Sequence, residues 1–343
     1  MSQEDRPHPG PIMQMATGYW ASATLFAAND MNLFGLLAEG PLTALDISRR
    51  AKVSVRGITL LLDACVGLGL LAKENTGLQS GGNVYRNTPS AEAFLVPGKS
   101  GYLGGALRWS ADQYAVWGDL ATSVRHGTPS TLPSLHLGED PERTRSFVLG
   151  MHQRAMGVAR GVIPFLNMEG VTRLLDVGGG PGAYASLLAR QYPGLQVDVL
   201  DLPAVVAIAK ELLTEAGLDD RVHVLAGDAT SVDYGVEEYD GVLFSGVLHQ
   251  MSSDIILHML SSAHRALRPG GKVWISDMML NADKTQPAFS TLFSLQMLLT
   301  SEEGAVFATD ECLEWLQTTG FTDMEARPLP PPLPYVVVTA RKS

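Results

Sequence analysis

From residue 172 onward, short apolar segments alternate with helix-like segments, and this alternation most constrains the fold. The apolar segments are TRLLDV, QVDVLD, VHVLAG, YDGVLFS and KVWISD, with helical patterns near 183–191, 203–216 and 253–267. Such alternation predicts an α/β domain, a mostly parallel Rossmann-like sheet with helices on both faces. The strand YVVVTAR closely follows FTDMEARP, so we expect these two to form an antiparallel pair at the sheet edge.

The chain before this region is predicted to be mainly helical. Residues 15–37 are apolar almost all round, which predicts one helix buried on more than one side and, for a terminal helix, favours a partner subunit. Thr43 with Asp46 resembles a capping box, and Ser54 can cap a following helix. We therefore expect two helices joined by a short turn.

Two short runs, 70–73 and 84–87, predict a hairpin that completes a winged-helix unit. The turn residues between them are Gly77, Gly81 and Gly82. A helix that reads DNA needs several polar side chains, whereas the helix expected over 55–68 carries Arg56 and is otherwise mostly apolar. The net charge of −11 also disfavours nucleic acid as a partner. We therefore expect this unit to serve packing or dimerisation rather than DNA binding.

Four segments are predicted along the chain. They are a disordered tail over 1–10, a winged-helix dimerisation domain over 11–100, a helical region over 101–168 and an α/β domain over 169–343. The two cysteines, Cys65 and Cys312, lie far apart, which fits a reducing cytoplasm rather than a disulfide framework. No signal peptide, membrane span or metal-ligand spacing is apparent, so we expect a cytoplasmic protein without a membrane or metal partner.

The segment LLDVGGGPG predicts a ligand site, because a strand runs into a glycine-rich turn and then a helix near Gly182. Asp201 ends the second strand, where a carboxylate can accept hydrogen bonds from ribose hydroxyls, and Asp228 follows the third strand, near an adenine position. A dinucleotide remains open on these features, whereas a P-loop is excluded because no Lys-Ser/Thr follows the glycines. Asp176 would repel a pyrophosphate but suits a cationic ligand. We therefore expect S-adenosyl-L-methionine, with S-adenosyl-L-homocysteine as its product.

The motifs DVGGGPG, DLPAVV, GDAT, VLH and HRALRPGGKVWISD resemble those of the class I O-methyltransferases. More narrowly, they resemble the plant caffeic-acid-type and bacterial small-molecule O-methyltransferases, which also have an N-terminal winged-helix dimerisation domain. The resemblance spans nearly the whole chain. It implies a homodimer that methylates a small aromatic or polyketide-like hydroxylated acceptor, and it makes 169–343 the domain that binds S-adenosylmethionine. It does not name the acceptor or the pathway.

The resemblance also implies where the ligands bind. The cofactor-binding positions, including the glycine turn, are Asp176, Gly178, Gly179, Gly180, Asp201, Leu202, Asp228, Ala229 and Ser245. The segment FVLGM resembles a helix that lines the family's substrate pocket, which nominates Phe147 and Met151, with ordinary core packing as the alternative.

The family's general base is the histidine of a VLHDW-like segment, which matches His249. A histidine within hydrogen-bond reach can take the acceptor's proton as it attacks the methyl group. The next residues differ from the family pattern, because Gln250 and Met251 replace Asp and Trp. Gln250 could hold a substrate group by hydrogen bonds but cannot stabilise an imidazolium by charge.

The family usually orients this histidine with two carboxylates. Asp277, at the end of VWISD, matches the first. Val306 or Phe307 falls near the place of the second, and equating it with Glu302 or Glu303 would require a shift of register. The altered acids leave open a cofactor-binding enzyme that performs cyclisation, decarboxylation or hydroxylation, and methylation at nitrogen or carbon is a further alternative.

Overall fold

The computed structural model describes residues 7–75, 82–131, 140–331 and 333–343. The chain forms two compact units, residues 1–112 and 113–343. Of the tail predicted over 1–10, residues 1–6 lie outside the described residues, and the first helix begins at Gly10. No described helix combines the length and apolar character that crossing a membrane requires.

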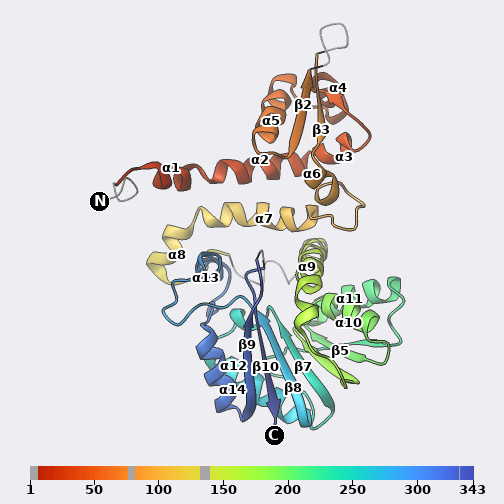
Figure 1. Cartoon of the computed structure of the whole chain (residues 1–343), viewed down its shortest axis with the longest axis vertical. Coiled ribbons are helices and arrows are strands. Elements are labelled where there is room, and N and C mark those ends of the chain that lie inside the picture. The colour runs from red at the N-terminus through yellow and green to blue at the C-terminus, as the bar shows by residue number, and fades with distance from the viewer. Residues whose placement is uncertain (1–6, 76–81, 132–139, 332) are drawn as a thin grey trace. The chain divides into compact units, whose positions relative to one another are not determined.

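The N-terminal unit is a small winged-helix fold (Figure 1). Its helices are α1 (Gly10–Thr17), α2 (Tyr19–Asp30), α3 (Leu33–Leu37), α4 (Ala44–Ala51), α5 (Val55–Gly67) and α6 (Pro89–Phe94), and α7 (Gly104–Trp117) runs across the boundary. The strands β1 (Leu42–Thr43), β3 (Asn83–Asn87) and β2 (Leu71–Asn75) form an antiparallel sheet in that order. This confirms the predicted hairpin strands, although Gly77 and Gly81 lie outside the described residues.

The two predicted helix N-termini, at Thr43 and at Ser54, are confirmed. The Thr43 hydroxyl accepts a hydrogen bond from the Asp46 backbone N–H, and the Thr43 backbone N–H donates to the Asp46 carboxylate. The Ser54 hydroxyl accepts from the Gly57 N–H at the start of α5. These caps satisfy N–H groups that have no partner inside the helix, which is why α4 and α5 begin there.

The prediction of one helix over 15–37 is wrong, because the chain breaks into α1, α2 and α3. Asn32 adopts a left-handed conformation with φ of 50°, which a right-handed helix cannot contain. The helix is also interrupted at Gly18, between α1 and α2. In the single chain, α1 buries no residue, and its apolar side chains face solvent.

The C-terminal unit is built on a seven-stranded sheet in the order β6-β5-β4-β7-β8-β10-β9. The strands are β4 (Arg173–Val177), β5 (Gln196–Asp201), β6 (Val222–Ala226), β7 (Tyr239–Ser245), β8 (Leu267–Asp277), β9 (Phe321–Pro328) and β10 (Val336–Lys342). The first five in the sheet are parallel, and β10 pairs antiparallel with both β8 and β9. The predicted parallel sheet and its antiparallel edge pair are therefore confirmed.

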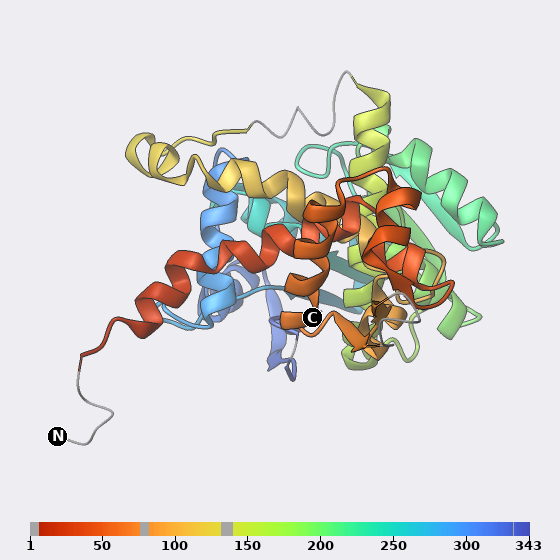
Figure 2. The same cartoon turned by 90° about the horizontal axis from the view of Figure 1, so that it is seen from above.

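The helices of this unit are α8 (Leu120–His126), α9 (Pro141–Val162), α10 (Ala183–Gln191), α11 (Pro203–Glu215), α12 (Ser253–Ala266), α13 (Ala288–Thr300) and α14 (Thr309–Thr318). Five of them, α9 to α12 and α14, pack against the sheet. One apolar core includes residues of α12 and α14, and the other includes residues of α9, α10 and α11. The green segments from α9 to α11 lie together on one side of the unit in both views (Figures 1 and 2). Burial on both faces explains why the parallel strands are nearly continuous apolar runs.

Candidate active site

The sheet order brings the predicted site residues to one edge. Strands β6, β5, β4, β7 and β8 are neighbours and run parallel, so their carboxyl ends lie side by side. The residues at or just beyond these ends are Asp228, Asp201, Gly178, Ser245, His249 and Asp277. Ligands of open α/β sheets bind at this edge.

The glycine turn after β4 requires glycine for two different reasons. Gly178 has φ of +64°, and a Cβ there would lie 2.7 Å from the Val247 side chain. Gly180 has φ of +60°, and a Cβ there would have no neighbouring atom within 4 Å. The backbone of Gly180 therefore borders open space, where a ligand can approach it closely.

The Asp176 carboxyl group lies buried beneath this turn. Among the described residues, neither of its oxygen atoms has a hydrogen-bond partner, and a Cβ on Gly179 would lie 2.6 Å from the carboxyl group. Burial, followed by the charge of Asp201, raises the pKa of Asp176 to about 7. Since buried carboxyl groups normally have hydrogen-bond partners, this group fits a positively charged ligand above the turn.

Asp201, at the end of β5, is held in place by the backbone. Its two carboxylate oxygens accept hydrogen bonds from the N–H groups of Gly180 and Leu202, each at 2.7 Å. Burial raises the pKa of Asp201, although both hydrogen bonds act in the opposite direction. Each oxygen retains a second lone pair with which it can accept a bond from a ligand hydroxyl.

The Asp228 side chain is exposed after β6 and accepts hydrogen bonds from the Thr230 backbone N–H and hydroxyl. Beside it, the Ala229 carbonyl accepts a hydrogen bond from the Tyr234 hydroxyl at 2.6 Å. These bonds fix the loop next to Asp201, because the Gly227 N–H also bonds to the Asp201 carbonyl at 2.9 Å. The loop therefore extends the same edge beyond β5.

His249 lies in a short helical turn after β7, and its side chain is buried. Its Nδ1 is 2.7 Å from Oδ1 of Asp277, at the end of β8. The same Oδ1 accepts a bond from the Met278 N–H at 2.8 Å, which holds the carboxylate in place. In the part of the chain that the structure describes, no hydrogen bond is found at Nε2 of His249.

Both candidates for the position of the second carboxylate, Val306 and Phe307, are apolar and buried. Val306 is buried and packs with Leu280, Ala308 and Phe293. Glu302 and Glu303 are exposed. Among the described residues, Asp277 is the only carboxylate found in contact with the imidazole.

The three residues predicted to bind substrate have different surroundings. Phe147 is half-buried on α9 and packs near Val205 and Ile208 of α11. Met151, one turn later, is also half-buried. The Gln250 side chain is exposed and turns back toward the Gly246 carbonyl, 3.5 Å away.

Further residues beside His249 were missed by the sequence analysis. The Phe293 ring meets the imidazole edge to face, with ring centroids 5.1 Å apart. The Arg154 guanidinium lies 5.7 Å from the Phe293 centroid. The i, i+4 pair Phe289 and Phe293 was the available sequence signal, but it does not say which side chain α13 would meet.

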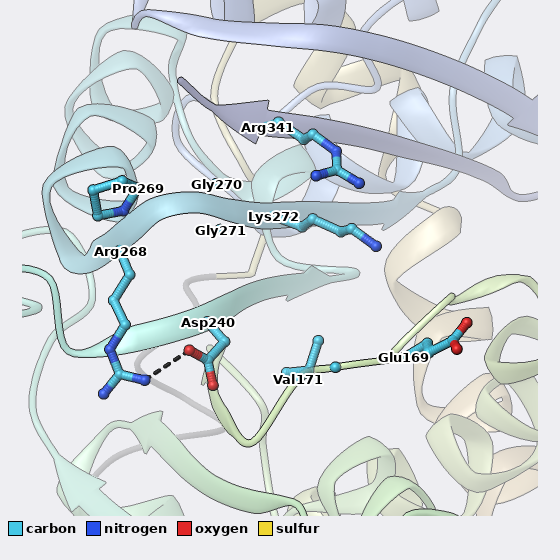
Figure 3. Close-up of a pocket in the computed structure, with 10 residues that line it drawn as sticks. Glu169, Val171, Asp240, Arg268, Pro269, Gly270, Gly271, Lys272 and Arg341 are labelled. Carbon is cyan, nitrogen blue, oxygen red and sulfur yellow. Dashed lines mark hydrogen bonds and ion pairs between the residues drawn. The ribbon is translucent and has the colours of Figure 1, made fainter.

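A hollow of about 270 Å³ lies away from this edge, near the starts of β4 and β7 and the end of β10. Figure 3 shows its charged lining, in which Arg268 forms an ion pair with Asp240 at 2.7 Å. Asp240 also accepts bonds from the backbone N–H groups of Thr172 and Arg173, which ties neighbouring strands together. The described residues contain no cluster of three or more side chains suited to a metal ion.

Comparison with known proteins identifies the family. A family model for the O-methyltransferase domain matches residues 117–322, and one for the O-methyltransferase dimerisation domain matches residues 13–97. The chain is 33% identical over 320 residues to tetracenomycin polyketide synthesis 8-O-methyl transferase TcmO of Streptomyces glaucescens, with 92% of each chain covered. It is also 33% identical over 320 residues to 3-hydroxy-5-methyl-1-naphthoate 3-O-methyltransferase of Streptomyces sahachiroi, with 92% of this chain and 90% of the relative covered.

A solved structure agrees with this assignment. Human N-acetylserotonin methyltransferase in complex with S-adenosylmethionine matches the chain with a TM-score of 0.88 and 27% identity, and 100% of both chains is covered. The glycine turn and strand-end acids predicted a cationic nucleoside cofactor, and the comparisons bear out S-adenosylmethionine. The chain therefore belongs to the O-methyltransferase family and is an S-adenosylmethionine-dependent enzyme.

Proposed function

We propose that this enzyme methylates a hydroxyl group of a small aromatic, polyketide-like acceptor, with His249 as the general base. The observation that carries the proposal is the 2.7 Å contact between Nδ1 of His249 and Asp277, at the sheet edge that also holds the glycine turn. The names of the two Streptomyces relatives, one acting in polyketide synthesis and one on a naphthoate, support the class of acceptor.

The cofactor side of the site is assigned to the residues at the ends of β4, β5, β6 and β7. Bound S-adenosylmethionine supplies a methyl group activated by a positively charged sulfur. Asp176 is suited to the ligand's positive charge because its buried carboxyl oxygens have no partner. Asp201 can accept bonds from the ribose hydroxyls. The residues proposed to complete the site are Gly178, Gly179, Gly180, Leu202, Asp228, Ala229 and Ser245.

His249 and Asp277 provide the proton transfer. Nδ1–H of His249 donates to the Asp277 carboxylate, so Nε2 carries the lone pair that faces the acceptor. As the acceptor oxygen takes the methyl group, the sulfur–methyl bond would break to leave neutral S-adenosylhomocysteine, and the hydroxyl proton would move to Nε2. The Asp277 carboxylate stabilises the imidazolium that results.

An apolar residue such as Val306 cannot supply a second carboxylate to stabilise the protonated imidazole. One carboxylate, rather than two, contacts the imidazole among the described residues. An acceptor hydroxyl that is more acidic than a simple phenol needs less help from the base, and positioning by the pocket can supply part of the rate. We propose that Phe147 and Met151 line this pocket, with Gln250 at its exposed margin.

The first prediction tests the base directly with methyl-labelled S-adenosylmethionine and a set of hydroxynaphthoic acids and hydroxyanthraquinones. Wild-type enzyme is expected to place the label on an acceptor oxygen. His249→Ala should lower kcat by roughly 10²–10⁴-fold, because it removes the base. Asp277→Asn should lower kcat by roughly 10–100-fold, because the imidazole keeps a hydrogen bond but loses the charge.

His258→Ala is the matched control, since His258 is exposed on α12. It should leave kcat unchanged, and all three variants should bind S-adenosylhomocysteine like the wild type. Label found on nitrogen or carbon would contradict transfer to oxygen, and undiminished transfer by His249→Ala would contradict the base. Conversion of an acceptor without label would instead support the non-methylating chemistries.

A further inference from the structure

Two cationic side chains lie next to each other on the large sheet, toward the edge opposite the proposed active site. Lys272 of β8 and Arg341 of β10 are direct cross-strand partners in an antiparallel pair. Side chains of such partners project from the same face of a sheet, so the two positive charges are neighbours. Like charges in this arrangement destabilise a sheet unless another group compensates them.

The residues beside this pair supply no negative charge. The neighbour of Lys272 on β7 is Gly241, and the neighbour of Arg341 on β9 is Thr322. Among the described residues, no ion pair is found for either Lys272 or Arg341. Nζ of Lys272 lies 5.8 Å from the ring centroid of Trp274 on the same strand. This ring is uncharged, so it leaves both positive charges in place.

The repulsion between the two cations acts on the titration of Lys272. Burial lowers the pKa of Lys272, and the charge of Arg341 lowers it further. The charge of Glu169 acts in the opposite direction and is the weakest of these three influences. An anion beside Lys272 would therefore favour the charged form that its present surroundings disfavour.

Both cations line the hollow of about 270 Å³ near the starts of β4 and β7. Figure 3 shows the two side chains extending the same way from neighbouring strands, apart from the ion pair of Arg268 with Asp240. Besides that ion pair, the charged lining consists of Lys272, Arg341 and Glu169. The hollow is therefore locally positive, although the protein as a whole has a net charge of −11.

The size and charge of the hollow suit a small oxyanion. Pockets for drug-sized ligands usually measure roughly 300–1,000 Å³, so a hollow of about 270 Å³ suits a smaller molecule. A phosphoryl group carries a charge of roughly −1.5 to −2 at pH 7 and has three acceptor oxygens. The Arg341 guanidinium can donate two parallel hydrogen bonds to such a group, and the Lys272 ammonium adds a compact charge.

We propose that Lys272 and Arg341 form a binding site for a phosphoryl dianion, held between β8 and β10 in this hollow. The bound anion neutralises the like-charged pair and connects the two strands. The site is separate from His249 and from the cofactor edge, so it does not depend on the identity of the acceptor. Free phosphate and a phosphate monoester present the same chemical group.

Calorimetric titration of inorganic phosphate into the full-length enzyme tests the site, with S-adenosylhomocysteine saturating and ionic strength constant. Wild-type enzyme is expected to bind phosphate with a Kd of about 1 mM, as for two side chains with charged donors. Lys272→Met and Arg341→Met should each weaken binding roughly 10-fold or more, because each removes a charged donor. Without phosphate, neither variant should have a lower Tm than the wild type, because each substitution relieves the repulsion between like charges.

Lys210→Met is the matched control, since Lys210 is exposed on α11, and it should bind phosphate like the wild type. Arg341 is exposed, so its variant keeps the test decisive if Lys272→Met does not fold.

Titration of glycerol 3-phosphate distinguishes the two sources of the phosphoryl group. Tighter binding of this monoester than of phosphate, lost in Lys272→Met and Arg341→Met, would support the site with an ester as its ligand. Tighter binding of phosphate, lost in the same variants, would support the free ion. A wild type that binds neither compound, or two variants that retain the wild-type affinity, would overturn the proposal.

Discussion

At the residue scale, Asp176 combines complete burial with a carboxyl group that lacks a hydrogen-bond partner. Its pKa of about 7 exceeds the ordinary value of 3.8, so the ionised form costs folding free energy in the absence of a ligand. A cationic ligand removes that cost by pairing with the carboxylate. The buried charge of Asp176 thus lowers the stability of the free protein and favours binding of the cofactor.

The second prediction follows from the raised pKa of Asp176. Because the folded pKa is raised, the destabilisation begins above pH 3.8 and grows until about pH 7, where it reaches the order of 4 kcal/mol. Asp176→Asn should therefore raise Tm relative to wild type more at pH 8 than at pH 5. S-adenosylhomocysteine should stabilise the variant less than it stabilises the wild type.

Thermal unfolding at both pH values, with and without S-adenosylhomocysteine, measures these effects. Asp220→Asn provides the control, since this side chain is exposed. A Tm difference that does not change with pH would show that Asp176 does not titrate in this range.

At the element scale, hydrogen bonds to Asp240 connect the beginnings of strands β4, β7 and β8. Its carboxylate in β7 accepts bonds from the Thr172 hydroxyl and N–H, from the Arg173 N–H in β4, and from the Arg268 guanidinium in β8. Burial acts to raise the pKa of Asp240, but these hydrogen bonds outweigh it and lower the pKa to about 2. The strands whose far ends carry the active site are thereby held together at their near ends.

The third prediction is that Asp240→Asn lowers the free energy of unfolding at pH 7 by about 2 kcal/mol. Because the folded pKa is depressed, the stabilisation is fully present well above pH 3.8 and is lost as the pH falls toward 2. Roughly half should be gone near pH 3. Urea unfolding at several pH values measures the difference between variant and wild type.

Asp219→Asn is a suitable control, because Asp219 is exposed and its removal should change the free energy of unfolding by less than about 0.5 kcal/mol. A difference between Asp240→Asn and wild type that stays constant down to pH 3 would contradict the assigned cause.

At the scale of the whole molecule, the exposed apolar side chains of α1 and α2 indicate an interface with a second protein chain. The exposed side chains are Ile12, Met13, Met15, Tyr19 and Trp20. The segment matched by the dimerisation-domain model, residues 13–97, includes all of these residues except Ile12. Several exposed large apolar side chains on neighbouring helices are typical of a protein interface.

The fourth prediction is that the full-length enzyme is a homodimer and that Met15→Asp with Trp20→Asp yields monomers, because buried charges destabilise an apolar interface. Size-exclusion chromatography with light scattering measures the mass. Val236→Asp is the control, since Val236 is 67% exposed in a loop of the C-terminal unit. A monomeric wild type, or a double variant that remains dimeric, would rule out this interface.

The sequence by itself determined the elements of the catalytic unit and the edge at which its ligands meet. Local sequence patterns predict apolar strands such as 239–245 and the turn after Asp176. The carboxyl ends of neighbouring parallel strands necessarily lie at one edge of the sheet. The break at Asn32 was missed, because an apolar run does not reveal where a backbone turns left-handed.

Only the tertiary structure decided which side chains surround His249. It joined Asp277 to Nδ1, packed the Phe293 ring against the imidazole and placed the Arg154 guanidinium over that ring. These residues come from elements far apart in the chain. Their contacts depend on how helices rotate and pack against the sheet, and no local spacing in the sequence encodes that rotation.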